Sequence, residues 1–209
     1  MTKRTRRPPR RVQLAGFLLI GIGALGGCGG GSDPLGNPPQ VVNSGGAVGT
    51  SLSFAYFQRC VNPILQTPHT IDLNGVVTTN TCSSAGCHAA ATGRGGAFRL
   101  QATATVEDLT NPANTPAVLQ NTLMFQNFFS AQAEVIINNP GQSLLVNKPL
   151  LRNVLHGGGL IFSSAQDPNI QVMEYWISNP MPAGQDEFSP AAANLFTPAD
   201  VMLGACNTN

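Results

Sequence analysis

The sequence predicts a small, mainly helical domain with long loops. Three segments carry apolar residues at steps of three and four, at residues 54–65, 117–133 and 168–177, and this spacing is typical of helices with one buried face. The chain also contains 23 glycines and 16 prolines, which favour turns and loops. Residues 51–209 are enough for one domain that buries roughly 70% of its unfolded surface.

The first 27 residues have the pattern of a secretory signal peptide. A basic start precedes an apolar stretch, Leu14 to Leu25, that is short for a membrane span. The sequence Leu-Gly-Gly-Cys that follows resembles the bacterial lipobox, in which the cysteine is acylated and becomes the new N-terminus. We therefore expect residues 1–27 to be removed and Cys28 to carry lipid. By the same resemblance, Gly29 after it directs the protein to the outer membrane.

Removal of this segment changes the charge balance. Six of the eleven Lys and Arg residues precede Cys28 and all ten acidic residues follow it, which leaves a net charge of −5. Nucleic-acid binding needs a basic face, so nucleic acid is not an expected partner. Only 10% of residues are charged, against about a quarter in ordinary proteins. Uncharged polar residues must supply solubility, which suits an exported protein.

Residues 28–50 are expected to form a lipidated flexible tether. They show no apolar periodicity and many helix breakers. A glycine-rich segment of this length has a root-mean-square reach of roughly 25 Å. The tether therefore separates the domain from a bilayer.

The first predicted helix covers residues 51–65, with Ser51 or Ser53 available as N-cap. Pro63 is expected to break or kink its end. Residues 66–81 contain proline, Asn-Gly and several threonines, which favour a loop or a hairpin.

Residues 82–88 carry the most informative motif, two cysteines with a histidine directly after the second. In c-type haem attachment, two thiols add across the haem vinyl groups and the following histidine binds the iron. Four residues separate Cys82 from Cys87, where the usual spacing has two. We expect one covalent haem c at these cysteines with His88 as proximal ligand. The alternative is a disulfide between the two cysteines that closes a surface loop.

The segments after this motif alternate between loops and helices. Residues 93–100 are glycine-rich and are expected to let the backbone lie against the cofactor. Residues 117–133 carry a helical pattern of leucine and phenylalanine, more typical of core than of a cofactor-binding segment. Residues 143–151 predict a short apolar helix with Ser143 as its cap.

The last clear helix is expected at residues 167–177. Asp167 is its N-cap, Pro168 occupies its first position, and apolar residues mark one face. Residues 180–209 form a proline-rich C-terminal tail.

The five cysteines divide into three roles. Cys28 is assigned to lipid and two others to haem, which leaves Cys60 and Cys206 as a disulfide candidate. Oxidising conditions outside the cytosol allow that bridge. Two alternatives stay open: Cys60 as a small buried hydrophobe, and another of the three pairings that four cysteines permit.

Several short motifs occur in a characteristic order over roughly residues 54–178. They are Cys-Val-x-Pro-Ile-Leu, the Cys-x4-Cys-His segment, Gly-Gly-x-Phe-x-Leu, Ser-Leu-Leu-x-x-Lys-Pro, His-Gly-Gly-Gly and a helix ending in Tyr-Trp-Ile. This order resembles the planctomycete-type cytochrome c domains of bacterial surface and periplasmic proteins. The resemblance implies a small cytochrome c-like helical domain over residues 51–209, with the haem between crossing terminal helices. Residues 66–81 and the tail depart from it.

The sixth ligand of such an iron has three candidates: His156, Met181 and an open position. In the common fold of small cytochromes the distal loop precedes the last helix, and His156 holds that place while Met181 follows the helix. The three glycines after His156 also allow backbone close to a ring. His156 is therefore favoured, and His69, in a polar loop, is expected to be solvated.

These features predict an electron carrier, a monohaem c-type cytochrome lipoprotein anchored in the bacterial cell envelope on the periplasmic or surface side. Other redox proteins of the envelope would be its partners. No nucleophile elbow, HExxH motif or carboxylate pair suggests an enzyme. One alternative is a haem-free surface lipoprotein, stapled by two disulfides, that acts as a binding or scaffolding module. A zinc or copper site is another, with ligands Cys82, Cys87, His88 and His156.

Overall fold

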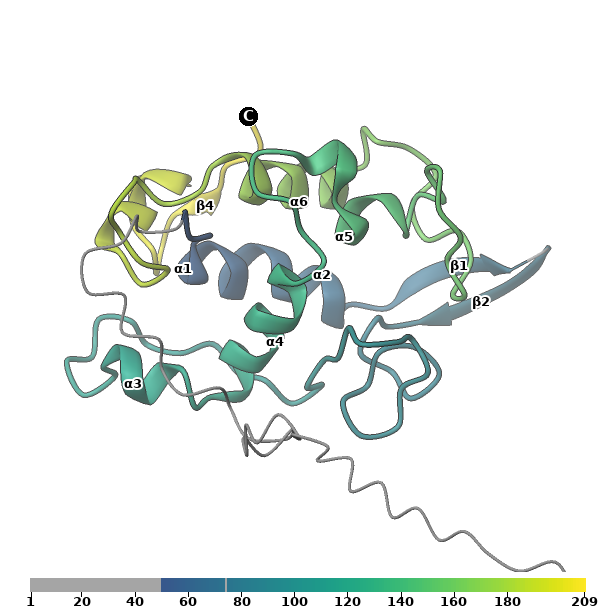
Figure 1. Cartoon of the computed structure of the whole chain (residues 1–209), viewed down its shortest axis with the longest axis horizontal. Coiled ribbons are helices and arrows are strands. Elements are labelled where there is room, and N and C mark those ends of the chain that lie inside the picture. The colour runs from purple at the N-terminus through teal and green to yellow at the C-terminus, as the bar shows by residue number, and fades with distance from the viewer. Residues whose placement is uncertain (1–49, 74) are drawn as a thin grey trace, which may run out of the picture. The chain divides into compact units, whose positions relative to one another are not determined.

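A helical segment from Phe54 to Gln66 crosses the centre of the fold (Figure 1). It consists of α1 (Phe54–Tyr56), a π-helical stretch η1 (Phe57–Val61) and α2 (Asn62–Gln66). The Ser53 hydroxyl accepts a hydrogen bond from the Tyr56 N–H at 3.0 Å and caps the first turn. Pro63 lies in the first turn of α2, where no helical N–H is needed, so the path continues through it.

The computed structural model describes residues 50–73 and 75–209. The predicted signal peptide, the predicted lipid-bearing Cys28 and all of the predicted tether except its last residue lie outside the described residues.

The helix α6 (Pro168–Ser178) packs against η1 and completes an aromatic core. Asp167 caps α6 as predicted, accepting a hydrogen bond from the Asn169 N–H at 2.9 Å. The Trp176 ring is fully buried, lies 5.3 Å from Phe57, and donates its indole N–H to the Ser53 carbonyl at 2.9 Å. The bond fixes the contact between two helices that lie far apart in the sequence.

The segment predicted as one helix at 117–133 is divided in two. It forms α3 (Pro116–Leu119) and α4 (Leu123–Gln132). The Thr122 hydroxyl accepts a hydrogen bond from the Phe125 N–H at 3.1 Å and begins a new helix. A capping side chain inside an apolar pattern therefore ends one helix and starts the next.

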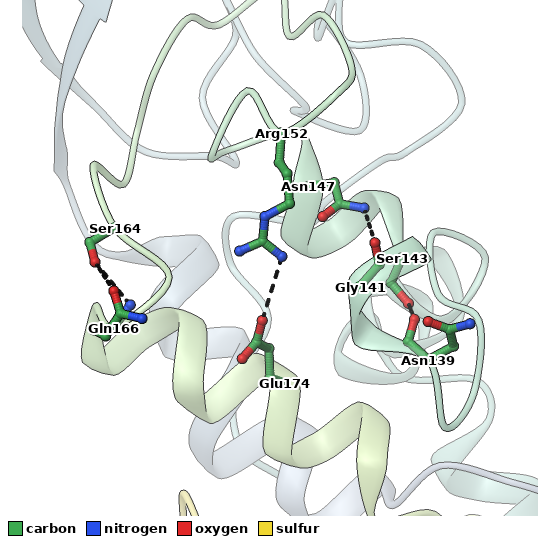
Figure 2. A network of polar contacts seen from close by, with 8 residues as sticks. All are labelled: Asn139, Gly141, Ser143, Asn147, Arg152, Ser164, Gln166 and Glu174. Atoms are coloured by element: carbon green, nitrogen blue, oxygen red, sulfur yellow. Dashed lines mark hydrogen bonds and ion pairs between the residues drawn. The ribbon is translucent and has the colours of Figure 1, made fainter.

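The region before α6 contains only short helical turns, η2 (Pro140–Gln142) and α5 (Leu144–Asn147). Ser143 occupies the N-cap position of α5 as predicted, but its hydroxyl makes no capping hydrogen bond. The hydroxyl instead accepts from the Ile136 N–H at 2.9 Å. It donates to the Asn139 carbonyl at 2.9 Å (Figure 2). The Asn147 amide donates to the Gly141 carbonyl at 2.8 Å, which ties α5 to the preceding turn.

Residues 66–81 include an antiparallel hairpin of β1 (His69–Leu73) and β2 (Val76–Asn80). Gly75 has a φ of +84° in its turn, a conformation that glycine adopts without strain. Val76, Val77 and the two threonines of β2 are exposed. A strand without a buried face shows no alternation of apolar and polar residues, so sequence periodicity does not distinguish a hairpin from a loop here.

The proline-rich tail folds back onto the first helical segment. It contains η3 (Pro190–Leu195) and a second antiparallel pair, β3 (Phe196–Thr197) and β4 (Ala205–Cys206). A disulfide joins Cys206 to Cys60, 146 residues apart. The Arg59 guanidinium adds hydrogen bonds to the carbonyls of Val201 at 2.7 Å and Gly204 at 3.1 Å.

The predicted fold class, a mainly α, cytochrome c-like helical domain, is therefore wrong. Helix accounts for 32% of the described residues. It is divided among six short α-helices, one π-helical stretch and two 3₁₀-helices, beside two small antiparallel sheets. The apolar spacing locates buried faces but does not mark where the helices end. Prolines follow three of them closely: Pro68 after α2, Pro149 after α5 and Pro180 after α6. The longest α-helix has 11 residues.

Candidate functional site

A cavity of about 440 Å³ lies beside the aromatic core. Its walls come from α2, the hairpin, the segment 80–98, α5, the loop 155–162 and α6. Most of the lining side chains are apolar, among them Ile64, Leu65, Ile71, Phe98, Leu145 and Phe162. A volume in this range is usual for sites that enclose a small molecule or cofactor.

The segment 82–88 folds into a compact turn against one wall. The His88 N–H donates to the Cys82 carbonyl at 2.9 Å, and the N–H groups of Cys87 and Ala89 both donate to the Ser84 carbonyl at 3.0 Å. Cys82, Cys87 and His88 all line the cavity. The turn thus brings two sulfurs and one imidazole to a single apolar space.

Both cysteines of this turn are free thiols. Burial raises the pKa of Cys82 to about 11, with a smaller contribution from neighbouring Cys87. The thiolate is the species that attacks a disulfide or is oxidised, so the raised pKa keeps Cys82 in the less reactive thiol form at neutral pH.

The His88 side chain is buried and held in one orientation. Its Nδ1–H donates to the Phe98 carbonyl at 3.1 Å, which leaves Nε2 with its lone pair. Gly95 lies directly against the ring: a Cβ there would lie 2.3 Å from both His88 Cε1 and Nδ1. Burial, the largest cause, lowers the pKa of His88, so the ring is neutral at neutral pH.

His156 has the same arrangement on another wall. Its Nδ1–H donates to the Gly159 carbonyl at 2.9 Å, and burial, the largest cause, lowers its pKa. Metal-binding histidines typically donate their second N–H to a carbonyl in this way, which fixes the tautomer and leaves Nε2 available. Both histidines are therefore neutral rings with one uncommitted nitrogen.

The rings of His88 and His156 lie 6.2 Å apart, with their planes within 10° of parallel. Imidazole nitrogen binds a transition metal at about 2.0–2.1 Å, so two imidazoles on opposite sides of one metal have centres roughly 6 Å apart. The observed separation of the ring centres is in this range. The uncommitted Nε2 atoms of His88 and His156 would hold a haem iron, and the largely apolar lining suits the macrocycle.

The hairpin β1–β2 holds the loop that carries His156. The Asp72 N–H donates to the Leu160 carbonyl at 3.2 Å, and the Leu160 N–H donates to the Asp72 carbonyl at 3.1 Å. Ile161 N–H also donates to the Pro149 carbonyl at 2.9 Å. The segment 66–81, which has no role in the predicted fold, thus positions a candidate ligand.

The other two candidate ligands are engaged elsewhere. His69 lines the cavity, but its Nε2–H donates to the Ile64 carbonyl at 2.6 Å and its ring packs 5.0 Å from Phe162. Met181 is buried outside the cavity lining, where its N–H donates to the Ser51 carbonyl at 2.7 Å. Of the three histidines, His88 and His156 are the two whose rings lie near each other with parallel planes.

The residues that line the cavity and that sequence reasoning missed include Met173, Glu134 and Lys148. Met173 lies on the buried face of α6, so its spacing indicates core and nothing more. Glu134 and Lys148 pair at 3.6 Å across 14 positions of the chain, and no local pattern signals such a contact.

Within residues 50–73 and 75–209, no group of three or more His, Cys, Asp or Glu side chains is placed to hold a metal ion. The same part of the chain contains no helix long and apolar enough to cross a membrane.

No protein-family model matches the chain, and neither a curated protein nor a solved structure matches it. A proposal for the function must therefore rest on the cavity and its side chains.

Proposed function

We propose that this protein is a c-type cytochrome that carries one covalent haem and transfers electrons at the bacterial cell envelope. The observation that carries the proposal is the convergence of two free thiols and two parallel imidazoles on one apolar cavity. The resemblance of the motif order to planctomycete-type cytochrome c domains points to the same chemistry.

Each residue has a distinct part in this proposal. Cys82 and Cys87 would each add S–H across one haem vinyl group, sulfur bonding one carbon and hydrogen the other. His88 and His156 would present their Nε2 lone pairs to the iron. Haem supplies the one-electron chemistry, while the chain sets ligation, burial and access. The largely apolar lining would keep water away from a bound haem and lower the local dielectric constant around it.

The two-histidine ligation has a consequence for the potential. Methionine opposite histidine raises a haem potential, so a site with two histidines should have a lower one. An electron carrier of low potential is the specific form of the proposal.

The direct test is expression of the full chain in a bacterium with haem-attachment machinery. We expect an intact mass increased by one haem and a low-spin reduced spectrum. Protein without the adduct, together with a peptide that contains a Cys82–Cys87 disulfide, would instead support the alternative of a haem-free binding or scaffolding lipoprotein.

The sixth ligand is tested by His156→Ala. Haem should stay attached, because attachment uses the thiols, but the iron should become high-spin and bind carbon monoxide or imidazole. Met181→Ala is the matched control, since Met181 lies outside the cavity lining. If Met181→Ala changes the spectrum and His156→Ala does not, the ligand assignment is wrong.

We also propose that Cys28 carries lipid and anchors the domain, with other redox proteins of the envelope as partners. Cys28→Ser should release haem-loaded protein from membranes with an unchanged spectrum. Continued membrane association of this variant would show that another surface binds the membrane.

A further inference from the structure

We propose that the ion pair of Lys148 and Glu134 sets the reduction potential of the iron, with Lys148 favouring the reduced state and Glu134 the oxidised state. This inference rests on the proposed function. It assigns a role to two residues that the haem motif does not include.

The pair lies in the wall of the cavity. Lys148 directly follows α5 and Glu134 lies just beyond α4, and their charged groups are 3.6 Å apart. The Leu145 N–H donates to the Glu134 carbonyl at 3.0 Å, so the two backbones are also joined. The Lys148 and Glu134 side chains are 31% and 15% exposed. Arg94, the remaining Lys, Arg, Asp or Glu side chain among the lining residues, is exposed.

Both charged residues line the same cavity as the two candidate ligands, His88 and His156. The cavity therefore brings the ion pair and the ligands to one largely apolar space.

The sign of the effect follows from the charge of the iron. Oxidation adds one positive charge at the metal, so a nearby cation opposes it and a nearby anion favours it. The interaction is strong where apolar walls lower the effective dielectric constant and weak where water screens it. A partly buried pair in the cavity wall should therefore matter, while a similar pair outside the cavity should not.

The chain contains such a control. Arg152 and Glu174 form an ion pair at 3.9 Å with side chains 34% and 31% exposed, and neither residue lines the cavity (Figure 2). The two pairs match in charge type and nearly in distance. They differ mainly in whether they face the site.

The experiment measures the reduction potential of the haem-loaded full chain by spectroelectrochemistry. Lys148→Gln should lower the potential and Glu134→Gln should raise it, each by a threefold to tenfold change in the equilibrium constant for reduction; tenfold is about 59 mV for one electron. The double variant should return close to the parent value. Lys148→Arg keeps the charge and should also stay close to it.

Arg152→Gln and Glu174→Gln are the matched controls and should shift the potential much less. Intact mass and spectrum are recorded for every variant to show that haem is attached and low-spin. Parent protein without haem overturns the proposed function and this inference together. Loaded variants in which Lys148→Gln and Glu134→Gln shift the potential in the same direction, or no more than the controls, overturn this inference alone.

Discussion

The two cysteine pairs lie in regions of opposite character. Cys60 and Cys206 join the first helical segment to the tail, beside a core of closely packed aromatic rings. Cys82 and Cys87 lie in a turn against a cavity and stay free. The difference shows that chain separation does not decide which thiols pair: the distant pair is bonded, and the pair five positions apart is not.

The same contrast extends to how each region is held. The core region depends on buried side chains, with Phe54, Phe57, Phe128 and Trp176 at most 1% exposed. The cavity region depends on backbone hydrogen bonds within and between loops, such as those of Asp72 with Leu160. The core region therefore provides stability, and the cavity region keeps reactive groups available.

Removal of both cavity thiols should have the largest effect. Cys82→Ala/Cys87→Ala should abolish covalent haem attachment, because each thioether bond needs one of these sulfurs. The free energy of unfolding of the haem-free protein should change by less than about 1 kcal/mol, since no bond joins the two thiols. Intact mass and chemical denaturation measure the two quantities. A retained haem adduct would show that covalent attachment does not depend on these two sulfurs.

Removal of the disulfide should have the reverse pattern. Cys60→Ala/Cys206→Ala should lower the free energy of unfolding by about 3–5 kcal/mol, because the bridge closes a loop of 146 residues. Haem should still be attached at 25 °C in molecules that fold. Denaturation without reductant gives the stability. Unchanged stability would mean that the aromatic core alone holds the tail in place.

Gly95→Ala should have an intermediate effect confined to the cavity. Its Cβ would lie 2.3 Å from two His88 ring atoms and 3.0 Å from the Cys87 carbonyl, so the ring must move and lose its bond to Phe98. We expect a loss of about 1–3 kcal/mol in the free energy of unfolding and a partly high-spin iron. Gly157→Ala is the control, with no atom within 4 Å of its Cβ. Equal effects of the two variants would show that His88 is not held by contact with Gly95.

The smallest effect is expected at the hairpin surface. Val77 is 64% exposed on β2, and Val77→Thr keeps a β-branched side chain. Thermal and chemical unfolding should change by less than about 0.5 kcal/mol, with the spectrum unaltered. A larger loss would indicate that another molecule or a membrane covers this strand.

Local signals predicted part of the fold well. Ser53 and Asp167 cap helices as expected, and the two helical segments at 54–66 and 168–178 have bounds close to those predicted. The helical class is wrong because helix length depends on capping inside a pattern, as at Thr122, and on strands such as β2 that expose both faces. Neither feature changes the apolar spacing that predicts a helix.

The candidate site likewise contains residues that the sequence predicts and residues that it does not. Cys82, Cys87 and His88 are adjacent in the chain, so a motif can identify them. Chain order favours His156 as the second ligand, and its ring lies parallel to that of His88. The roles of the hairpin, Glu134 and Lys148 depend on contacts between distant segments, which no single segment of the sequence encodes.

The bridge between Cys60 and Cys206 encloses every residue that lines the cavity, from Ile64 to Met173. A protease that cuts any exposed loop between these cysteines therefore leaves one covalently connected molecule. The two fragments should migrate together on a denaturing gel without reductant and separate once reductant is added. A single cut would then not release either wall of the cavity.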